Sequence, residues 1–305
     1  MQQKNRRELT PEEKWEQATL ANNFIFYKVM RHHPAECKEM LELLLGIKVD
    51  RIEMRNEETI DVDFMAKGIC LDLYVSDSDR VFDIEIQATD TGELPQRARY
   101  YQGIMDVDLL ASGQPYRDLK ESHVIFICMA DVFGRGLPVY TFENRCLEDG
   151  SIGLGDRTHK HFFIAPLCAT LLEKGERRSF FELLTGGAAG TELTGTLEAL
   201  VADAKHNTQW RMQYMTWERQ QFYAHEAGYK QGEQAGLRDV ARRMLAEGLP
   251  LEQVAHLTQL APDELRAAFE LSLKSYDKST KELSDKLVIC LKDNKEAKRN
   301  FVNGG

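Results

Sequence analysis

The sequence predicts an α/β protein with a mixed central sheet flanked by helices, followed by an all-helical extension. A helical pattern precedes three strand patterns, and a second helix separates these from the uninterrupted apolar run Val124–Met129. From Ala169 onward only helical patterns follow. The resulting order αβββαβ buries its apolar residues when helices cover both faces of a mixed sheet.

The first helix is expected over residues 22–45, because its apolar residues recur at helical spacing. Pro34 should divide it, since proline lacks the backbone donor and clashes with the preceding turn. Gly46 is a suitable stop. The preceding residues 1–18 are polar, so we expect a mobile leader without the apolar stretch of a signal peptide.

The strand patterns are short runs of apolar residues bounded by turn residues. The clearest is Val81–Gln87, which alternates strictly between apolar and polar positions. Val124–Met129 is apolar throughout, as expected of a central strand covered on both faces. The other expected strands are 49–54, 68–75, 138–142 and 162–167, and a helix is expected over 93–111.

The second half of the chain should form helices over 191–206 and 208–226, with the aromatic stretch 210–217 packed in a core. Gly228, Gly232 and Gly236 then recur every fourth residue, which places them on one helix face. This segment is either a homodimer contact through the C-terminal helices or a flexible linker. The expected divisions are a leader (1–18), a core (19–170), a helical extension with the glycine segment (171–237), a small helical unit (238–272) and a charged, disordered tail (273–305).

Composition restricts the class of protein. The chain of 305 residues has 43% hydrophobic residues, and its net charge of −10 argues against a protein that coats nucleic acid through a broad basic surface. No apolar run is long enough to cross a bilayer, so no membrane partner is expected. The six cysteines form no CxxC pair, which favours reduced thiols in a cytoplasmic protein.

The chemical signature lies on two strands expected to form a hairpin. Alternation places Asp83, Glu85 and Gln87 on one strand face, and Asp72 lies on the preceding strand. Two neighbouring carboxylates repel unless a cation neutralises them, and hard oxygen ligands suit Mg²⁺ or Mn²⁺. Asp72, Glu85 and the backbone carbonyl of Ile86 are the expected metal ligands. Gln87 could orient the attacking water, which makes Asp72, Glu85 and Gln87 the catalytic candidates.

Several segments resemble the Rpn family of recombination-promoting nucleases and transposases, within the PD-(D/E)XK nuclease superfamily. The resemblance implies a restriction-endonuclease-like core, a Mg²⁺-dependent DNA endonuclease that acts in recombination or mobile elements, and DNA as the partner. It gives Asp72, Glu85 and Gln87 the motif positions, although the superfamily usually has Lys in place of Gln87. The resemblance rests on segments 22–30, 71–75, 83–87, 89–101, 124–128 and 141–146.

Other polar residues leave alternatives open. Arg97, Arg99 and Tyr100 could contact DNA phosphate. The alternative is that Arg97 forms an ordinary surface pair with Glu93. Asp83 is expected to be exposed. The first helix of this superfamily often donates an acid to the site, and the candidates are Glu36, Glu39 and Glu42.

Two further features are interpreted as structural and not as binding sites. His159-Lys160-His161 lacks a third ligand at recognisable spacing, so we expect a surface turn. The unit over 238–272 resembles a helix-turn-helix, but its second helix offers few side chains that read bases, which favours an assembly role. The alternative function for the whole chain is a catalytically weak relative that works by binding DNA or a protein.

Overall fold

The computed structural model describes residues 9–54, 73–89 and 92–265. It divides into two compact units, 1–218 and 219–305, at a point within one long helix. The first unit contains the sheet and the candidate active site, and the second contains a small helical core.

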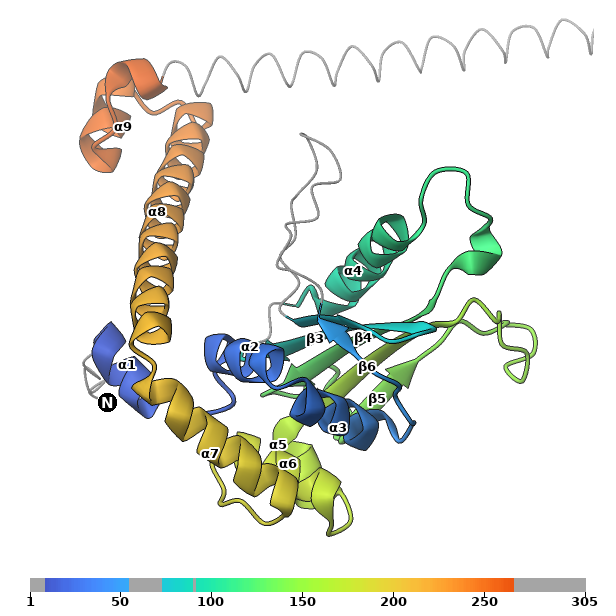
Figure 1. Ribbon diagram of the computed structural model, residues 1–305. Helices are drawn as coiled ribbons and strands as arrows, with labels where there is room; N and C mark the ends of the chain where they lie inside the picture. Colours follow the sequence, from blue (N-terminus) through green and yellow to red (C-terminus); the bar gives the residue numbers. More distant parts are fainter. Residues whose placement is uncertain (1–8, 55–72, 90–91, 266–305) are drawn as a thin grey trace, which may run out of the picture. The chain divides into compact units, whose positions relative to one another are not determined.

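The sheet of the first unit has six strands in the order β1-β2-β3-β4-β6-β5 (Figure 1). β3, β4 and β6 are parallel, whereas β1, β2 and β5 pair antiparallel with their neighbours. The mixed sheet expected from the sequence is therefore present. The strands are β1 Glu53–Met54, β2 Leu73–Ser76, β3 Arg80–Gln87, β4 Glu121–Cys128, β5 Val139–Phe142 and β6 Thr158–Ile164.

Alternation along β3 divides the sheet into two faces. Phe82, Ile84 and Ile86 belong to the core formed with α2, α3, α5, α6 and α7, and we call this side the α2 face. Val81 belongs to the opposite core, formed with α4, which we call the α4 face. Figure 1 shows α4 on one side of the sheet and α2 and α3 on the other. The helices are α2 Asn23–His32, α3 Pro34–Leu45, α4 Leu94–Leu109, η1 Tyr116–Asp118, α5 Ala165–Leu171, α6 Glu176–Leu184 and α7 Glu192–His206.

The first expected helix is divided at Pro34, as the sequence predicted. α2 ends at His32 and α3 begins at Pro34. α3 ends where Gly46 adopts a left-handed conformation (φ 69°) and donates its N–H to the Glu42 carbonyl oxygen. A residue with a Cβ atom would be strained at this position, so glycine favours the end of the helix here.

The residues expected to form a mobile leader include a short helix, α1 (Pro11–Gln17). Thr10 caps it reciprocally with Glu13. Trp15 is fully buried, and its ring lies 5.1 Å from that of Tyr214 between centroids. The expectation of a mobile leader was therefore wrong for this segment, because one large aromatic side chain anchors it to the core. Residues 1–8 lie outside the described part of the chain.

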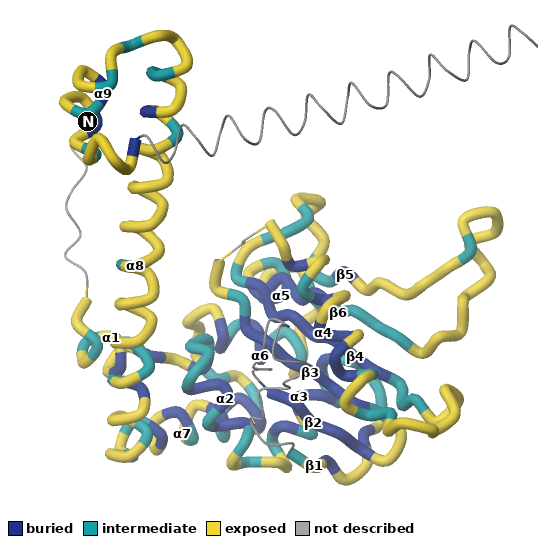
Figure 2. Tube along the Cα trace, turned by 90° about the horizontal axis from the view of Figure 1, so that it is seen from above, coloured by how far each residue is buried: buried dark blue, intermediate teal, exposed yellow. Residues whose placement is uncertain are grey.

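The C-terminal region consists of α8 (Thr208–Ala246) and α9 (Leu251–Thr258). The glycine segment is part of α8 and is therefore helical and not a flexible linker, but its helical form does not by itself support the homodimer contact considered above. Figure 2 shows α8 exposed along much of its length, in contrast to the buried strands of the sheet. The small core of the second unit contains Ala241, Val254 and Leu265. The expected disordered tail lies outside the described residues.

No helix among the described residues is both long enough and apolar enough to cross a membrane.

Candidate functional site

The central acid of the predicted motif, Glu85, is buried in the middle of the sheet. It lies on β3, pairs with Phe126 of β4 and is 2% exposed. Asp83 shares its face and is also buried, so the expectation that Asp83 is exposed was wrong. The reason is α4, which covers this face and which the strand pattern alone could not place.

Arg97 of α4 contacts two of the predicted motif side chains, Glu85 and Gln87. Its Nη2 atom lies 2.5 Å from Oε2 of Glu85, and its Nη1 atom donates to Oε1 of Gln87 over 2.8 Å. The same guanidinium donates to the Tyr101 hydroxyl from Nη2 over 2.8 Å. A buried carboxylate requires such a compensating charge, because its desolvation is unfavourable without one. The sequence suggested a DNA phosphate or Glu93 as the partner of Arg97, and the structure adds Glu85 and Gln87 as contacts.

Aromatic rings complete the surroundings of this charge pair. The Arg97 guanidinium lies 5.3 Å from the Tyr101 ring centroid and 5.6 Å from that of Phe126. Burial raises the pKa of Tyr101 well above its ordinary value, and the Glu85 carboxylate adds to this shift. Tyr101 is therefore a hydrogen-bonding phenol at neutral pH. The Gln87 side-chain amide donates to the Thr89 carbonyl oxygen, which fixes its orientation.

The remaining predicted residues occupy different positions. Arg99 and Tyr100 are exposed on α4. The Ile86 side chain is buried on the α2 face, so only its backbone could serve as a ligand near Glu85. Glu42 of α3 accepts a hydrogen bond from the Val49 N–H over 2.9 Å. Asp72 lies outside the described residues.

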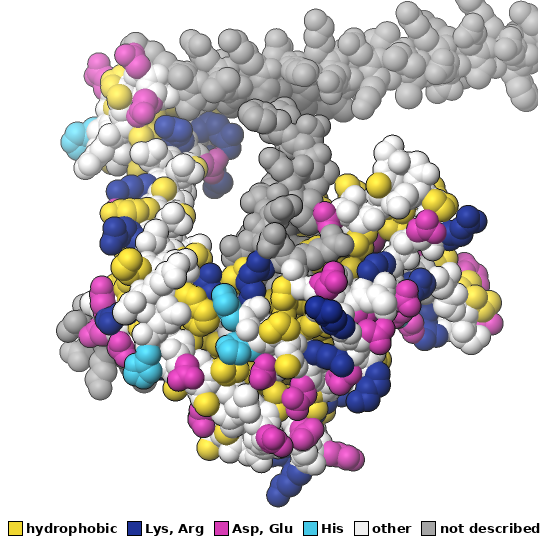
Figure 3. Space-filling model, in the orientation of Figure 1, with side chains coloured by type: hydrophobic (Ala, Val, Ile, Leu, Met, Phe, Trp, Pro, Cys, Tyr) yellow, Lys and Arg dark blue, Asp and Glu magenta, His cyan; other side chains and the backbone are white. Residues whose placement is uncertain are grey.

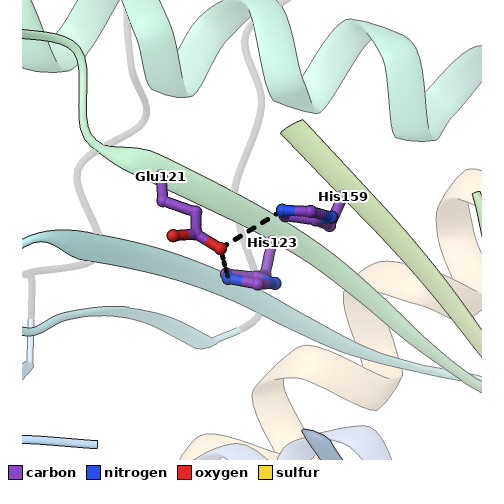
Figure 4. Close-up of side chains that lie close together, drawn as sticks. All are labelled: Glu121, His123 and His159. Atoms are coloured by element: carbon purple, nitrogen blue, oxygen red, sulfur yellow. Dashed lines mark ion pairs between the residues drawn. The ribbon is translucent and has the colours of Figure 1, made fainter. Parts of the chain in front are cut away.

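A second polar cluster lies on the α2 face, at the start of the parallel strands. It consists of Glu121 and His123 of β4 and His159 of β6 (Figure 4). One carboxylate oxygen of Glu121 lies 3.3 Å from Nε2 of His123 and 3.2 Å from Nε2 of His159. Because His123 pairs with His159 across the two strands, their imidazole rings stack. His159-Lys160-His161 thus lies in a strand, and the expectation of a surface turn was wrong.

His161 of β6 contacts His123 and so adds a third imidazole to this polar cluster. Its Nε2 atom lies 3.2 Å from Nδ1 of His123, and its Nδ1 atom lies 3.3 Å from the Thr141 hydroxyl. Burial is the main cause that lowers the pKa of His123 to about 3 and that of His161 to about 4. Both imidazoles are therefore neutral at neutral pH.

The sequence contained one signal for this cluster, the alternation Glu121-Ser122-His123 just before the apolar run. The expected strand began only at Val124 and so excluded these residues. Their proximity to His159 depends on the parallel pairing of β4 with β6, which sequence spacing does not reveal.

Two models of known protein families match parts of the chain. The family model of PD-(D/E)XK nuclease family transposases matches residues 38–136. That range contains the mixed-sheet strands β1 to β4, α4 and the site around Glu85. The chain therefore has the fold and sequence of a PD-(D/E)XK nuclease.

A second family model identifies the branch of these nucleases. The C-terminal helix-turn-helix domain of the Rpn/YhgA-like nuclease family matches residues 234–270. Together the two matches support an Rpn-family PD-(D/E)XK transposase as the class of protein. None of the curated proteins or solved structures compared with it matches significantly.

Proposed function

We propose that the chain is a divalent-metal-dependent DNA endonuclease that hydrolyses phosphodiester bonds and acts in recombination or mobile elements. The observation that carries the proposal is the buried Glu85 carboxylate, which is held by the Arg97 guanidinium on the sheet face where the nuclease motif falls. The family matches support the same class of chemistry.

Asp72 is the second metal ligand in this proposal. The described register of the β2–β3 hairpin pairs Leu73 with Ile84 and Tyr74 with Asp83. Tyr74 belongs to the core on the α4 face, the side that Glu85 shares. Asp72 directly precedes Leu73 in the sequence, and the resemblance to the nuclease family supports its assignment.

The donor set fits a hard cation. Two carboxylates and the Ile86 carbonyl provide oxygen ligands of the kind that Mg²⁺ and Mn²⁺ prefer. Bound there, the cation would lower the pKa of the attacking water and stabilise charge on the scissile phosphate.

Arg97 supplies the positive charge that Gln87 cannot provide. Its guanidinium contacts both Glu85 and Gln87, so it holds their side chains in one orientation. Its side chain is 31% exposed, which leaves it accessible to a phosphate oxygen. We assign Gln87 the role of orienting water, with its amide positioned by Arg97 and Thr89.

Contact with DNA is local in this proposal. Acidic and basic side chains are interspersed on the face shown in Figure 3, in keeping with the net charge of −10. The exposed Arg99 and Tyr100 of α4 are the proposed contacts beside the site. The helix-turn-helix family match over residues 234–270 favours DNA binding over the assembly role expected from the sequence, so we assign this unit further affinity for DNA.

A nicking assay tests the proposal. Supercoiled plasmid is incubated with the protein and Mg²⁺ or Mn²⁺, alongside Asp72→Ala, Glu85→Ala and the control Glu93→Ala, which alters an exposed acid at the start of α4. We expect nicking by the wild type and the control, and its loss in the two site variants. If no metal supports nicking but a mobility shift shows binding, the chain is instead a catalytically weak relative that acts by binding DNA. If neither is seen at low salt, DNA is not its partner.

A further inference from the structure

The cluster of Glu121, His123 and His159 is separate from the nuclease site. It lies on the α2 face, where the Phe82 ring stacks on His123, whereas Glu85 faces α4. Along β3, Glu85 pairs with Phe126, further toward the carboxyl end of β4 than His123. A ligand at one cluster would therefore have different side-chain donors from a ligand at the other.

The distances from the Glu121 carboxylate oxygen to the two imidazole nitrogens match the spacing of ligands around a small transition-metal ion. Two ligands at about 2.0–2.1 Å from a tetrahedral Zn²⁺ stand roughly 3.3 Å apart. Oε1 of Glu121 lies 3.3 Å from Nε2 of His123 and 3.2 Å from Nε2 of His159. All three ligand atoms lie within 4.8 Å of one another.

His123 provides an independent indication of a ligand. The residue is 5% exposed, and its Nε2 atom has no hydrogen-bond partner within the described part of the chain. If Nδ1 of His123 donates to His161, then Nε2 carries a lone pair that faces a carboxylate oxygen, and the two acceptors repel. In the other tautomer, Nε2–H is close to Glu121 but forms no hydrogen bond with it. A cation between Nε2 of His123 and the Glu121 carboxylate oxygen would remove this repulsion in the first tautomer.

The contact with His161 is also typical of a metal site. A histidine that binds a metal usually donates its other ring N–H to a neighbouring acceptor, which fixes the tautomer. His161 is in the position of that acceptor, and its own Nδ1 atom lies close to the Thr141 hydroxyl. The positive charge of Arg157, 3.9 Å from Glu121, opposes a cation, so binding depends on the two imidazoles as well as on the carboxylate.

We propose that Glu121, His123 and His159 form a binding site for a divalent transition-metal ion of the Zn²⁺ class, distinct from the Mg²⁺ or Mn²⁺ site of the nuclease. Two imidazoles and one carboxylate suit Zn²⁺ better than Mg²⁺. Glu121 and His159 are 30% and 25% exposed in their side chains, so the fourth coordination position faces solvent. The ion would join the starts of β4 and β6 and thereby stabilise the sheet.

Titration of the full chain with Zn²⁺ tests this site, and Co²⁺ absorption reports its coordination geometry. We expect one equivalent of Co²⁺ to give the intense visible bands of tetrahedral coordination. His159→Gln and Glu121→Gln should each lower the Zn²⁺ affinity of this site at least about tenfold. His225→Gln, which alters an exposed histidine of α8, is the matched control and should bind as the wild type does.

Two variants distinguish this site from metal binding elsewhere on the chain. Glu85→Gln alters the nuclease site and should keep the Zn²⁺ affinity; loss of affinity there would place the ion at the nuclease site and overturn the proposal. His159→Gln is the primary variant because His159 is partly exposed, and circular dichroism checks its fold before titration. The proposal would also be overturned if folded His159→Gln kept the Zn²⁺ affinity and the Co²⁺ spectrum of the wild type. The same holds if the wild type itself neither bound Zn²⁺ nor gave the Co²⁺ spectrum.

Discussion

Arg97 of α4 places its Nη2 atom 2.5 Å from Oε2 of Glu85 on β3. The contact joins the helix that covers the α4 face to the acid at the centre of the sheet. The guanidinium therefore neutralises a buried carboxylate at the place where the proposed metal would also bind. Arg97 and the cation should consequently compensate for one another in stabilising Glu85.

Arg97→Ala tests this compensation. Breaking a buried ion pair by removing one partner is typically destabilising by about 3–5 kcal/mol. Because the Arg97 side chain is partly exposed, we expect a smaller loss, about 1–3 kcal/mol. Mg²⁺ should then raise the melting temperature of the variant more than that of the wild type, because the cation replaces the lost charge. Thermal unfolding with and without Mg²⁺ measures both effects.

The control for this prediction is Arg99→Ala, which removes an exposed arginine from the same helix. Its stability and its response to Mg²⁺ should match those of the wild type. In a Glu85→Gln background, Arg97→Ala should have a smaller effect, since no buried charge is left unpaired. Equal effects in both backgrounds would show that the pair is not coupled.

Gln87→Lys restores the residue usual in the superfamily but should not increase cleavage by itself. The amide oxygen of Gln87 lies 2.8 Å from Nη1 of Arg97, so a lysine would bring two positive charges together. At about 4 Å such charges repel by about 1 kcal/mol in water and about 4 kcal/mol at an effective permittivity near 20. We expect a less stable protein that nicks plasmid no faster than the wild type.

The double variant Gln87→Lys/Arg97→Ala distinguishes repulsion from simple loss of the amide. With the guanidinium removed, the lysine can take over the positive charge next to Glu85, so nicking should exceed that of either single variant. A double variant slower than both single variants would mean that Arg97 has a role that lysine cannot replace. Initial nicking rates at saturating Mg²⁺ provide the comparison.

The strand alternation of β3 was enough to predict which side chains share the face of Glu85. It could not predict that this face is buried, because the cover comes from α4, which follows β3 in the sequence. Asp83 was therefore assigned to solvent. The contacts of Arg97 were missed for the same reason, since they depend on how the helix packs over the strand.

The histidine cluster shows a different limit of sequence analysis. Glu121 and His123 are remote in sequence from His159, and only the β4–β6 pairing unites them. The position of proline and glycine, in contrast, was sufficient to predict the break at Pro34 and the helix end at Gly46. Local backbone chemistry determines such boundaries, whereas the sites of this chain depend on contacts between distant segments.

Trp15→Ala should detach α1 from the core. The indole is fully buried against Tyr214, and its Nε1 atom donates to the Lys205 carbonyl oxygen over 3.3 Å. Truncating a buried tryptophan typically lowers stability by about 3–5 kcal/mol. Leu9→Ala, which alters an exposed residue just before α1, should change stability by less than about 0.5 kcal/mol. Denaturant unfolding measures both, and equal effects would contradict the anchoring role of Trp15.

Cys37 of α3 should be chemically inert in the folded protein. It is fully buried, and burial raises the pKa of its thiol from 9.0 to about 12. Alkylation at pH 8 requires the thiolate and access to it, so Cys37 should react at least about 100-fold more slowly than the partly exposed Cys146. Peptide mapping by mass spectrometry follows each thiol separately, and comparable rates would contradict this burial.

The same shift predicts how Cys37 affects stability at high pH. Because the folded pKa lies above the unfolded one, its stabilising contribution is complete below about pH 9 and is lost as the pH rises toward 12. The unfolded chain releases the thiol proton first in that range, which favours unfolding. Cys37→Ala lacks this proton, so its free energy of unfolding should fall less steeply between about pH 9 and 10.5 than that of the wild type. Parallel slopes would show that the thiol does not contribute.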